Sequence, residues 1–463
     1  MKKYLLALLA FPALSYAQPT FQQGMNDSAF LKMISDNVLK SKSADKNLYN
    51  LTKNIGGRLA GSPQMLLAEK WGAEALKNAG ADKVILQECK VPHWVRGNGD
   101  MASVTYMENG KNITMQLSML SIGNSVGTGS SGIVAPLIQI NSFDELEQRK
   151  DEIKVKIVFY NCPFQDEFIQ TFMAYGTNVK YRTQGASRAA KYGALAVLVR
   201  SMTNSTDNNA HTGTLVYTDS LPKIPAACIG LWDVAKLDSL FAKGISLQAK
   251  LLTHAMMLPD EIGHNVIGVL QGTEFPNEVI TVGGHLDSWD VNEGAQDDGA
   301  GVVQTIEILR AFKALGFQPK HTIQFVLFAN EENGGRGGEK YAEEPLRENE
   351  QHIFAMESDA GGFTPRGFGF SVNEKAWGKI ITWKHLFEPY GADHFSRYGG
   401  GSDIEPLGEK YGTPMSSLSP DSQRYFDLHH AAGDVFENVN MRELKLGAIN
   451  MAGLLYLVDK YGL

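Results

Sequence analysis

The stretch VGGHLDSWDVNEGAQDDGAG, from Val282 to Gly301, joins a predicted strand to a predicted helix. The segment before it, EVITV (278–282), is typical of a buried strand in a parallel sheet. After it, apolar residues recur at helical spacing from Val302 to Leu315. Ligands of open α/β sheets bind at the carboxyl ends of such strands. The stretch therefore predicts an α/β fold with a ligand site at this edge.

Two pairs of metal-binding residue types lie within this stretch. His285 and Asp287 follow the predicted strand, and Asp297 and Asp298 open the predicted helix. Imidazole nitrogens and carboxylate oxygens are ligands that suit zinc. These residues alone leave a purely structural interpretation open, in which Asp298 caps the helix and His285 is a polar residue in a turn.

Further acidic and imidazole side chains follow other predicted strands. Glu331 and Glu332 come after one strand, Asp359 comes after another, and His430 lies near the carboxyl end of the chain. Because the strands of a parallel sheet point the same way, we expect these groups to meet at one edge. So many carboxylates would repel one another and tend towards protonation. Two divalent cations that share one carboxylate would remove this repulsion.

The adjacent pair Glu331 and Glu332 suggests a division of roles. Neighbouring residues at the end of a strand point in different directions, so one carboxylate can bind a metal while the other faces a water molecule. The structural alternative for such a pair is a solvated turn.

Composition limits the classes of protein that fit. The chain has 463 residues, which corresponds to roughly two to three domains. Its 43% hydrophobic and 20% charged residues are typical of a soluble globular protein. A net charge of −8 without a Lys/Arg-rich run argues against nucleic-acid binding. Three cysteines cannot form a disulfide framework, and Cys162 and Cys228 either pair or remain thiols.

The first 17 residues read as a secretory signal peptide. Lys2 and Lys3 precede an apolar run from Leu5 to Leu14, and cleavage is expected near Ala17. The apolar run is shorter than the about 20 residues that a transmembrane helix needs. We therefore expect an exported protein, periplasmic or secreted.

The pattern of the chain changes between about Tyr106 and His254. Short apolar runs alternate there with turn clusters, and none of the carboxylate and histidine clusters falls in this segment. We predict a catalytic domain in two parts, 18–108 and 256–463, with a mostly parallel central sheet flanked by helices. A β-rich domain, 109–255, is inserted between them. The alternative is an irregular extension of one large sheet.

The motifs together resemble those of a known family. The matching segments are GGHLDSWD (283–290), QDDGAG (296–301), ANEENGG (329–335), ESDAGG (357–362), GGGSDI (399–404) and LHHAAGD (428–434). This ordered set resembles the co-catalytic zinc exopeptidases. GRLAGSP (57–63) also matches, and the inserted segment is similar to the protease-associated domain of that family, so the resemblance covers nearly the whole mature chain.

The resemblance implies two zinc ions and assigns five ligands to them. Asp297 would bridge both ions. One ion would also take His285 and Asp359, and the other would take Glu332 and His430. His430 is preferred to its neighbour His429 because the family histidine lies four residues before an acidic residue, here Asp434.

The resemblance also implies the roles of two further carboxylates. Glu331 would be the general base, and Asp287 would orient the imidazole of His285. A non-proline cis peptide bond between Asp297 and Asp298 is expected, because relatives use it to aim the bridging carboxylate.

The function implied is hydrolysis of dipeptides or short peptides by an aminopeptidase or dipeptidase. A zinc-bridged water, activated by Glu331, would attack the peptide carbonyl. Relatives form homodimers, and neither nucleic acid nor membrane is an expected partner. Two alternatives remain: a glutaminyl cyclase-like acyltransferase with a single zinc, and a metal-free binding or receptor protein on the same fold.

Overall fold

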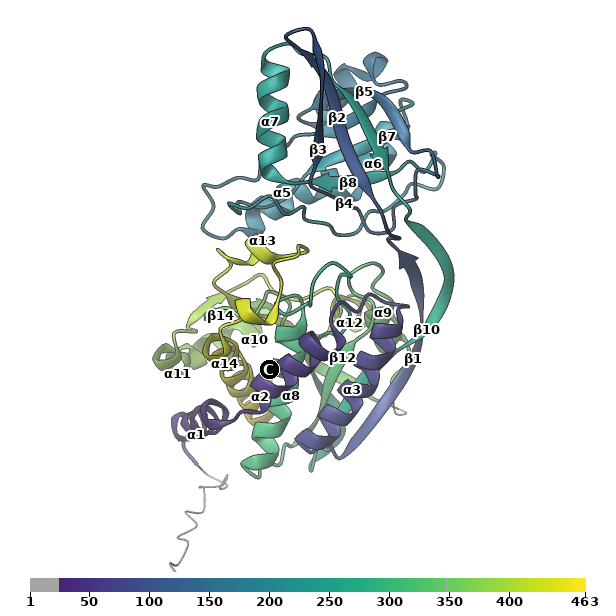
Figure 1. Cartoon of the computed structure of the whole chain (residues 1–463). Coiled ribbons are helices and arrows are strands. Elements are labelled where there is room, and N and C mark those ends of the chain that lie inside the picture. Colours follow the sequence, from purple (N-terminus) through teal and green to yellow (C-terminus); the bar gives the residue numbers. More distant parts are fainter. Residues whose placement is uncertain (1–24, 347–348) are drawn as a thin grey trace, which may run out of the picture.

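The chain folds into two lobes, each built on an eight-stranded sheet (Figure 1). The computed structural model describes residues 25–346 and 349–463, so the predicted signal peptide lies outside the described residues. The first lobe is made of residues 25–95 and 256–463, and the second lobe of residues 101–252. The paired strands β1 and β10 run along one side of the first lobe and lead into the second.

The sheet of the first lobe is mixed. In spatial order its strands are β1 (Lys83–Val95), β10 (Met256–Leu270), β12 (His321–Phe328), β11 (Phe275–His285), β13 (Gln351–Glu357), β16 (Met415–Pro420), β14 (Pro365–Ser371) and β15 (His394–Ser396). The four neighbours β12, β11, β13 and β16 are parallel. The pairs β1–β10, β10–β12 and β16–β14 are antiparallel, and the edge pair β14–β15 is parallel. The α/β class is confirmed, and the sheet is mixed, with parallel pairing at the centre and at the β14–β15 edge.

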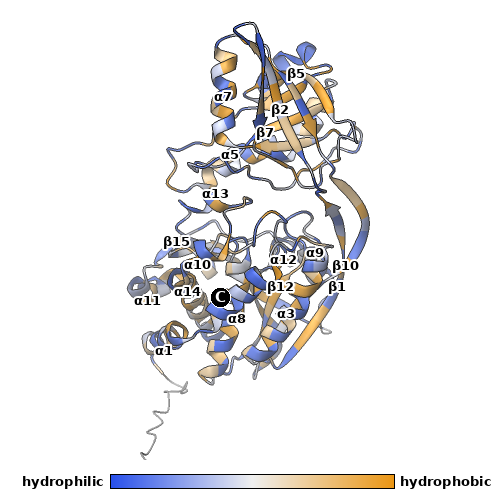
Figure 2. Ribbon diagram, viewed as in Figure 1, coloured by the Kyte–Doolittle hydropathy of each residue, from blue (hydrophilic) through white to orange (hydrophobic). Residues whose placement is uncertain are grey.

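Helices cover both faces of this sheet, so its central strands are buried on both sides. All eight residues of β12 are buried. One face packs against α1 (Asp27–Lys40), α3 (Pro63–Ala79), α8 (Gly299–Ala314) and α14 (Met441–Tyr461). The other face packs against α9 (Arg336–Glu343) and α12 (Glu405–Tyr411). Helices such as α3 show mixed colours in Figure 2, as expected for amphipathic elements.

Two helix starts follow from local sequence. The side chain of Ser62 accepts a hydrogen bond from the amide of Met65 and, with Pro63 next in the chain, begins α3. Asp298 caps α8 by accepting from the amide of Gly301. The first lobe also contains α2 (Ser43–Tyr49), η1 (Asn50–Ile55), α10 (Glu374–Ile380), α11 (Lys384–Phe387) and α13 (Tyr425–Leu428).

The second lobe has its own sheet and four α-helices. The strand order is β3 (Lys111–Leu117), β2 (Met101–Glu108), β9 (Gln248–Leu252), β5 (Ile133–Ile140), β6 (Ile157–Tyr160), β7 (Ala196–Arg200), β8 (Ala226–Ile229) and β4 (Met119–Ser121). The helices are α4 (Phe143–Gln148), α5 (Phe172–Thr183), α6 (Gly185–Ala190) and α7 (Leu231–Ala242). The segment predicted as β-rich is therefore itself α/β, with β5, β6, β7 and β8 parallel.

The chain passes from the first sheet to the second near residue 100, and not at the predicted boundary at 108/109. The predicted boundary puts β2 in the first part of the catalytic domain, but β2 forms a hairpin with β3 and also pairs with β9. A domain boundary at 108/109 would cut this hairpin. The division into separately folding domains stays a prediction.

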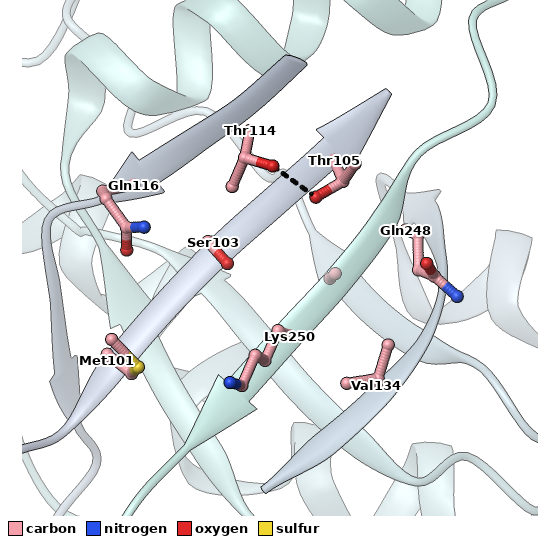
Figure 3. Close-up of a pocket in the computed structure, with 9 residues that line it drawn as sticks. Met101, Ser103, Thr105, Thr114, Gln116, Val134, Gln248 and Lys250 are labelled. Atoms are coloured by element: carbon pink, nitrogen blue, oxygen red, sulfur yellow. Dashed lines mark hydrogen bonds between the residues drawn. The ribbon is translucent and has the colours of Figure 1, made fainter. Parts of the chain in front are cut away.

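The outward face of the β3–β2–β9 sheet is exposed and polar. Ser103, Thr105 and Thr114 line a shallow hollow there (Figure 3). The hydroxyl oxygens of Thr105 and Thr114 lie 3.0 Å apart across the strand pair. None of the predicted site residues lines this hollow.

A second contact joins the lobes, on the side of α13 (Figure 1). Phe172 of the second lobe stacks on Tyr425 with ring centroids 5.2 Å apart, and Tyr175 stacks on Phe426 at 4.9 Å. The hydroxyl of Thr171 donates to the carbonyl of Ser422 at 2.7 Å.

Two sequence-level points concern membranes and cysteines. Within residues 25–346 and 349–463, no helix combines the length and the apolar character that a bilayer crossing requires.

Cys89, Cys162 and Cys228 are all free thiols, so Cys162 and Cys228 do not pair.

Candidate metal centre

The predicted site residues meet at the carboxyl end of the parallel strands. His285 ends β11, Glu331 and Glu332 follow β12, and Asp359 follows β13. His430 comes from the loop after α13. Because the three strands are parallel neighbours, their loops emerge on the same side, as the sequence predicts.

Asp297 lies between two histidines. One carboxylate oxygen, Oδ1, is 3.2 Å from Nε2 of His285, and the other, Oδ2, is 3.1 Å from Nε2 of His430. Nε2 of His285 is also 3.4 Å from the Asp359 carboxylate, and Nε2 of His430 is 3.1 Å from the Glu332 carboxylate. All five predicted ligands thus lie together, in two groups that share Asp297.

The backbone around Asp297 is held by Asp434. The carboxylate of Asp434 accepts from the amides of Gln296 at 2.7 Å and Asp297 at 3.1 Å. The peptide bond between Asp297 and Asp298 is cis, which confirms that prediction. The side chain of Asp298 caps α8. The helix cap expected from the purely structural interpretation is therefore present, and it is compatible with a metal site at Asp297.

Asp287 has a different main contact from the one predicted. Its carboxylate accepts from the amides of Glu331 at 3.0 Å and Glu332 at 3.2 Å. Nδ1 of His285 is closer to the main-chain carbonyl of Asp287, at 3.0 Å, than to its carboxylate, at 3.6 Å. The Asp287 side chain therefore mainly fixes the turn that carries the two glutamates. The imidazole of His285 is oriented chiefly by a main-chain oxygen.

The two glutamates differ in exposure. Glu332 is buried, at 4% exposure, and one of its oxygens faces His430. Glu331 is partly exposed. This difference is what a metal ligand beside a water-facing base requires.

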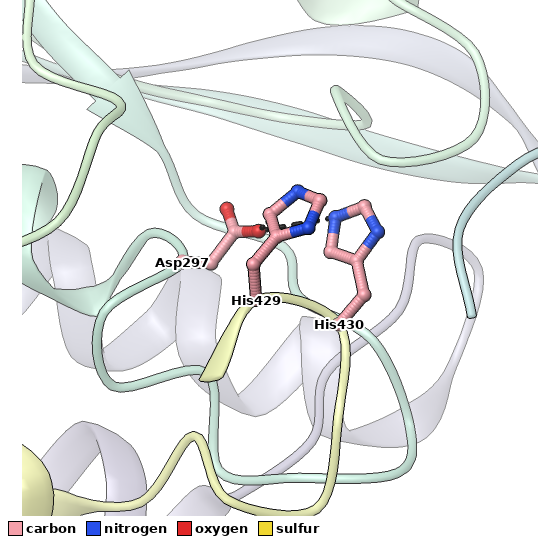
Figure 4. A group of neighbouring side chains, drawn as sticks. All are labelled: Asp297, His429 and His430. Carbon is pink, nitrogen blue, oxygen red and sulfur yellow. Dashed lines mark ion pairs between the residues drawn. The ribbon is translucent and has the colours of Figure 1, made fainter. Parts of the chain in front are cut away.

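His429 is a neighbour that the sequence leaves as a second possibility. Its ring stacks on that of His430 with centroids 3.5 Å apart, and both rings reach towards Asp297 (Figure 4). Nε2 of His429 is 3.6 Å from Asp297, against 3.1 Å for His430. Asp297, His429 and His430 could also form a ligand group, as could His285, Asp297 and Asp359. Only His430 also contacts Glu332, which favours it.

The cluster carries more negative charge than its histidines can balance. Burial raises the pKa of Glu332 to about 8, and the Asp297 carboxylate adds to this rise. Burial likewise raises the pKa of Glu331 to about 7, with Asp359 contributing and His285 opposing. Burial would also raise the pKa of Asp297, but hydrogen bonds from His285 and His430 outweigh it and hold that pKa well below its usual range. Protons or cations must therefore neutralise this cluster.

Arg58 is a residue of the site that the sequence does not assign. Its side chain is fully buried and donates to the carbonyls of Leu286 at 2.5 Å, Glu293 at 2.8 Å and Gly294 at 3.0 Å. It thus crosslinks the loop between His285 and Asp297. A Cβ on the preceding Gly57 would lie 2.9 Å from the Trp289 carbonyl, so this close approach requires glycine. The GRLAGSP motif signals the position, but it does not reveal the contacts.

Comparison with known proteins finds relatives over most of the chain. The family model for peptidase family M28 matches residues 265–455. Human carboxypeptidase Q is 36% identical over 413 residues, which cover 89% of this chain and 84% of the relative. A peptidase M28 precursor from Shewanella amazonensis superposes with a TM-score of 0.87 at 28% identity, covering 94% of this chain and 96% of that one. A zinc aminopeptidase from Bacillus subtilis shares the fold, with a TM-score of 0.63 at 20% identity and coverage of 90% and 94%.

Proposed function

Because the chain belongs to peptidase family M28 and is a metallo-exopeptidase, we propose that it is a two-zinc aminopeptidase or dipeptidase that hydrolyses dipeptides or short peptides. The proposal rests on one observation above all. The two oxygens of Asp297 each face a different histidine, and each histidine faces a further carboxylate. A shared carboxylate between two ligand groups is the arrangement that a pair of metal ions needs.

We propose that His285, Asp297 and Asp359 hold one zinc ion and that Asp297, Glu332 and His430 hold the other. The donors fit zinc in type. One oxygen of Glu332, Oε1, is buried and accepts no hydrogen bond from the described residues, so it is available to a metal. When bound, such ions lower the pKa of a water molecule and polarise a peptide carbonyl.

The chain's own residues supply the proton transfers. Glu331 accepts a proton from the attacking water and returns it to the nitrogen of the leaving amine, so that it ends the cycle as it began. Asp287 keeps Glu331 in place by accepting from its amide at 3.0 Å. Arg58 and Asp434 fix the two ends of the loop that presents Asp297.

The contacts of the second lobe with segments of the site support the proposal that the substrate is short. Its residue Asn124 donates to the carbonyl of Asn333, next to the glutamate pair, at 3.2 Å. Its residue Thr212 donates to the carbonyl of His430 at 2.9 Å. We propose that this lobe, residues 101–252, is a separately folding domain that covers the site and restricts substrate length. The predicted signal peptide supports export, and the family resemblance supports a homodimer.

A substrate panel tests the proposed function. Zinc-loaded protein should cleave dipeptides with a free amino group, because a terminal ammonium is attracted to the carboxylate cluster. It should cleave their N-acetylated forms and peptides of about ten residues much more slowly. The measurement is initial rate by product chromatography, with the Glu331→Gln variant as the blank. Equal rates on the acetylated or long peptides would contradict exopeptidase action on short substrates.

A further inference from the structure

A loop of the second lobe, His211 to Gly213, lies against the segment that carries His430. The ring nitrogen Nδ1 of His211 is 2.8 Å from the carbonyl of His429. The amide of Thr212 donates to the carbonyl of His430 at 2.9 Å. The carbonyl of Thr212 is in turn 3.3 Å from Nδ1 of His430. Both the backbone and the imidazole of His430 are therefore in contact with the second lobe.

The Thr212 carbonyl beside Nδ1 favours one tautomer of the His430 imidazole. Nε2 of His430 faces Asp297 and Glu332, each at 3.1 Å, so Nε2 is the nitrogen available to a metal. A neutral imidazole that binds a metal through Nε2 carries its proton on Nδ1. With a metal at Nε2, that N–H would donate to the Thr212 carbonyl, which would set both the tautomer and the ring orientation.

Arg182, from α5 of the second lobe, holds the Thr212 carbonyl. Its guanidinium donates to that oxygen at 3.1 Å and to the Tyr175 hydroxyl at 2.6 Å. The residue is 3% exposed, and no carboxylate among the described residues forms an ion pair with it. A carbonyl oxygen has two lone pairs, so it can accept from Arg182 and from His430 together.

The loop is shaped to fit this guanidinium. A Cβ on Gly213 would lie 2.2 Å from Cζ of Arg182, and the φ of Gly213 is +132°, which disfavours other residues. On its other side the loop is bound to the second lobe, since the Thr212 hydroxyl donates to the Ser121 carbonyl at 2.8 Å. The amide of His211 donates to the Ser201 hydroxyl at 2.9 Å.

His430 also needs support for its backbone. Its φ is +60°, a left-handed conformation that is uncommon for residues other than glycine. The hydrogen bond from Thr212 to the His430 carbonyl supports this conformation directly. The imidazole, the backbone and the neighbouring His429 are thus all held from outside the first lobe.

We propose that the 211–213 loop and Arg182 position His430 for metal binding, so that the second lobe is a structural part of the metal centre. Arg182 is a positioning residue: its guanidinium binds the Thr212 carbonyl and also lies 3.5 Å from Nδ1 of His430. The proposal rests on the proposed function in that His430 must be a zinc ligand. It adds that zinc affinity at this ligand and docking of the second lobe are coupled, and such coupling acts equally in both directions.

Zinc retention in three variants tests the positioning role. Arg182→Met removes the donors to the Thr212 carbonyl, and Gly213→Ala displaces the loop. Each should lower zinc affinity about 10–100-fold, as loss of a partner of a metal ligand typically does. Arg182→Lys keeps one cationic donor and should recover part of the affinity. The measurement is the chelator concentration at which half of the zinc is lost, with folding checked by circular dichroism.

The matched control is Arg200→Met. Arg200 also lies in the second lobe and donates to Asn161 at 3.2 Å, within that lobe. It should keep wild-type zinc affinity, because the 211–213 loop is untouched. If Arg182→Met and Gly213→Ala fold and also keep wild-type affinity, the positioning role is refuted.

Wild-type protein gives a second test that needs no substitution. If the coupling exists, removing zinc should speed hydrogen exchange at the amide of Thr212, which donates to His430. The amide of Val197, which donates to Pro225 inside the second lobe, should be unaffected. Unchanged exchange at Thr212 after full zinc removal would overturn the coupling.

His430→Ala separates this inference from the proposed function. Loss of about one zinc equivalent in His430→Ala, with none lost in His429→Ala, supports the ligand assignment. If His430→Ala retains all its zinc, the ligand assignment fails and the inference fails with it. If His430→Ala loses zinc while Arg182→Met and Gly213→Ala do not, only the inference fails.

Discussion

Replacing Glu331 by glutamine is expected to lower kcat by about 10²–10⁴-fold, the usual contribution of a general base. Glutamine keeps the size of the side chain and can still form hydrogen bonds, but it cannot take a proton from water. Zinc content should remain near that of the wild type, because the buried neighbour Glu332 is the residue that faces His430. The measurements are steady-state kinetics on a dipeptide and zinc content by atomic absorption.

Glu332→Gln is the matched comparison. It makes the same chemical change one residue away, and it should weaken metal binding because Glu332 lies 3.1 Å from Nε2 of His430. The roles would have to be exchanged if Glu331→Gln loses zinc while Glu332→Gln retains it. Near-normal activity of Glu331→Gln would mean that another group is the base.

Asp297→Asn is expected to abolish binding of both zinc ions. Each oxygen of Asp297 faces one of the two ligand groups, and asparagine has only one oxygen and no charge. Zinc content should fall from about two equivalents to nearly none, and activity should be lost with it. Measurement of zinc and of dipeptide hydrolysis on the same preparation checks both parts.

Asp290→Asn provides the control for this change. Asp290 lies in the same loop, but it is exposed and pairs with Arg96 at 2.6 Å. Its substitution should leave zinc content and kcat unchanged. A variant at Asp297 that keeps one tightly bound ion would show that the carboxylate does not serve both ions.

The convergence of the site could be predicted because it depends on strand direction. His285, Glu332 and Asp359 each end or follow a parallel strand, and parallel neighbours deliver their loops to one edge whatever the details of packing. The helix after Asp297 could also be predicted, because its capping residue and its regularly spaced apolar residues are adjacent in the sequence.

Contacts made by main-chain atoms could not be predicted. The Thr212 carbonyl that faces His430 is 218 residues away in the chain, and a carbonyl is present in every residue, so no residue type marks it. The three carbonyls bound by Arg58 pose the same difficulty. For Asp287 the family resemblance implied an interaction with His285, but its carboxylate mainly binds two amides.

The sheet that β2 joins could not be predicted for a similar reason. β2 and β3 form a hairpin that belongs to the second sheet, and nothing in the pattern of β2 distinguishes the sheet that it joins. The choice depends on pairing with β9, which lies about 150 residues later in the chain, so a local pattern cannot decide it.

The most direct test of the two-zinc assignment is the zinc content of the purified wild-type chain, measured after saturation with zinc and removal of loosely bound metal. The shared Asp297 carboxylate predicts about two equivalents per chain, with activity lost on chelation and restored by zinc. One equivalent would contradict it and favour a single-zinc acyltransferase of the glutaminyl cyclase type. None at all would contradict it in favour of a metal-free binding protein.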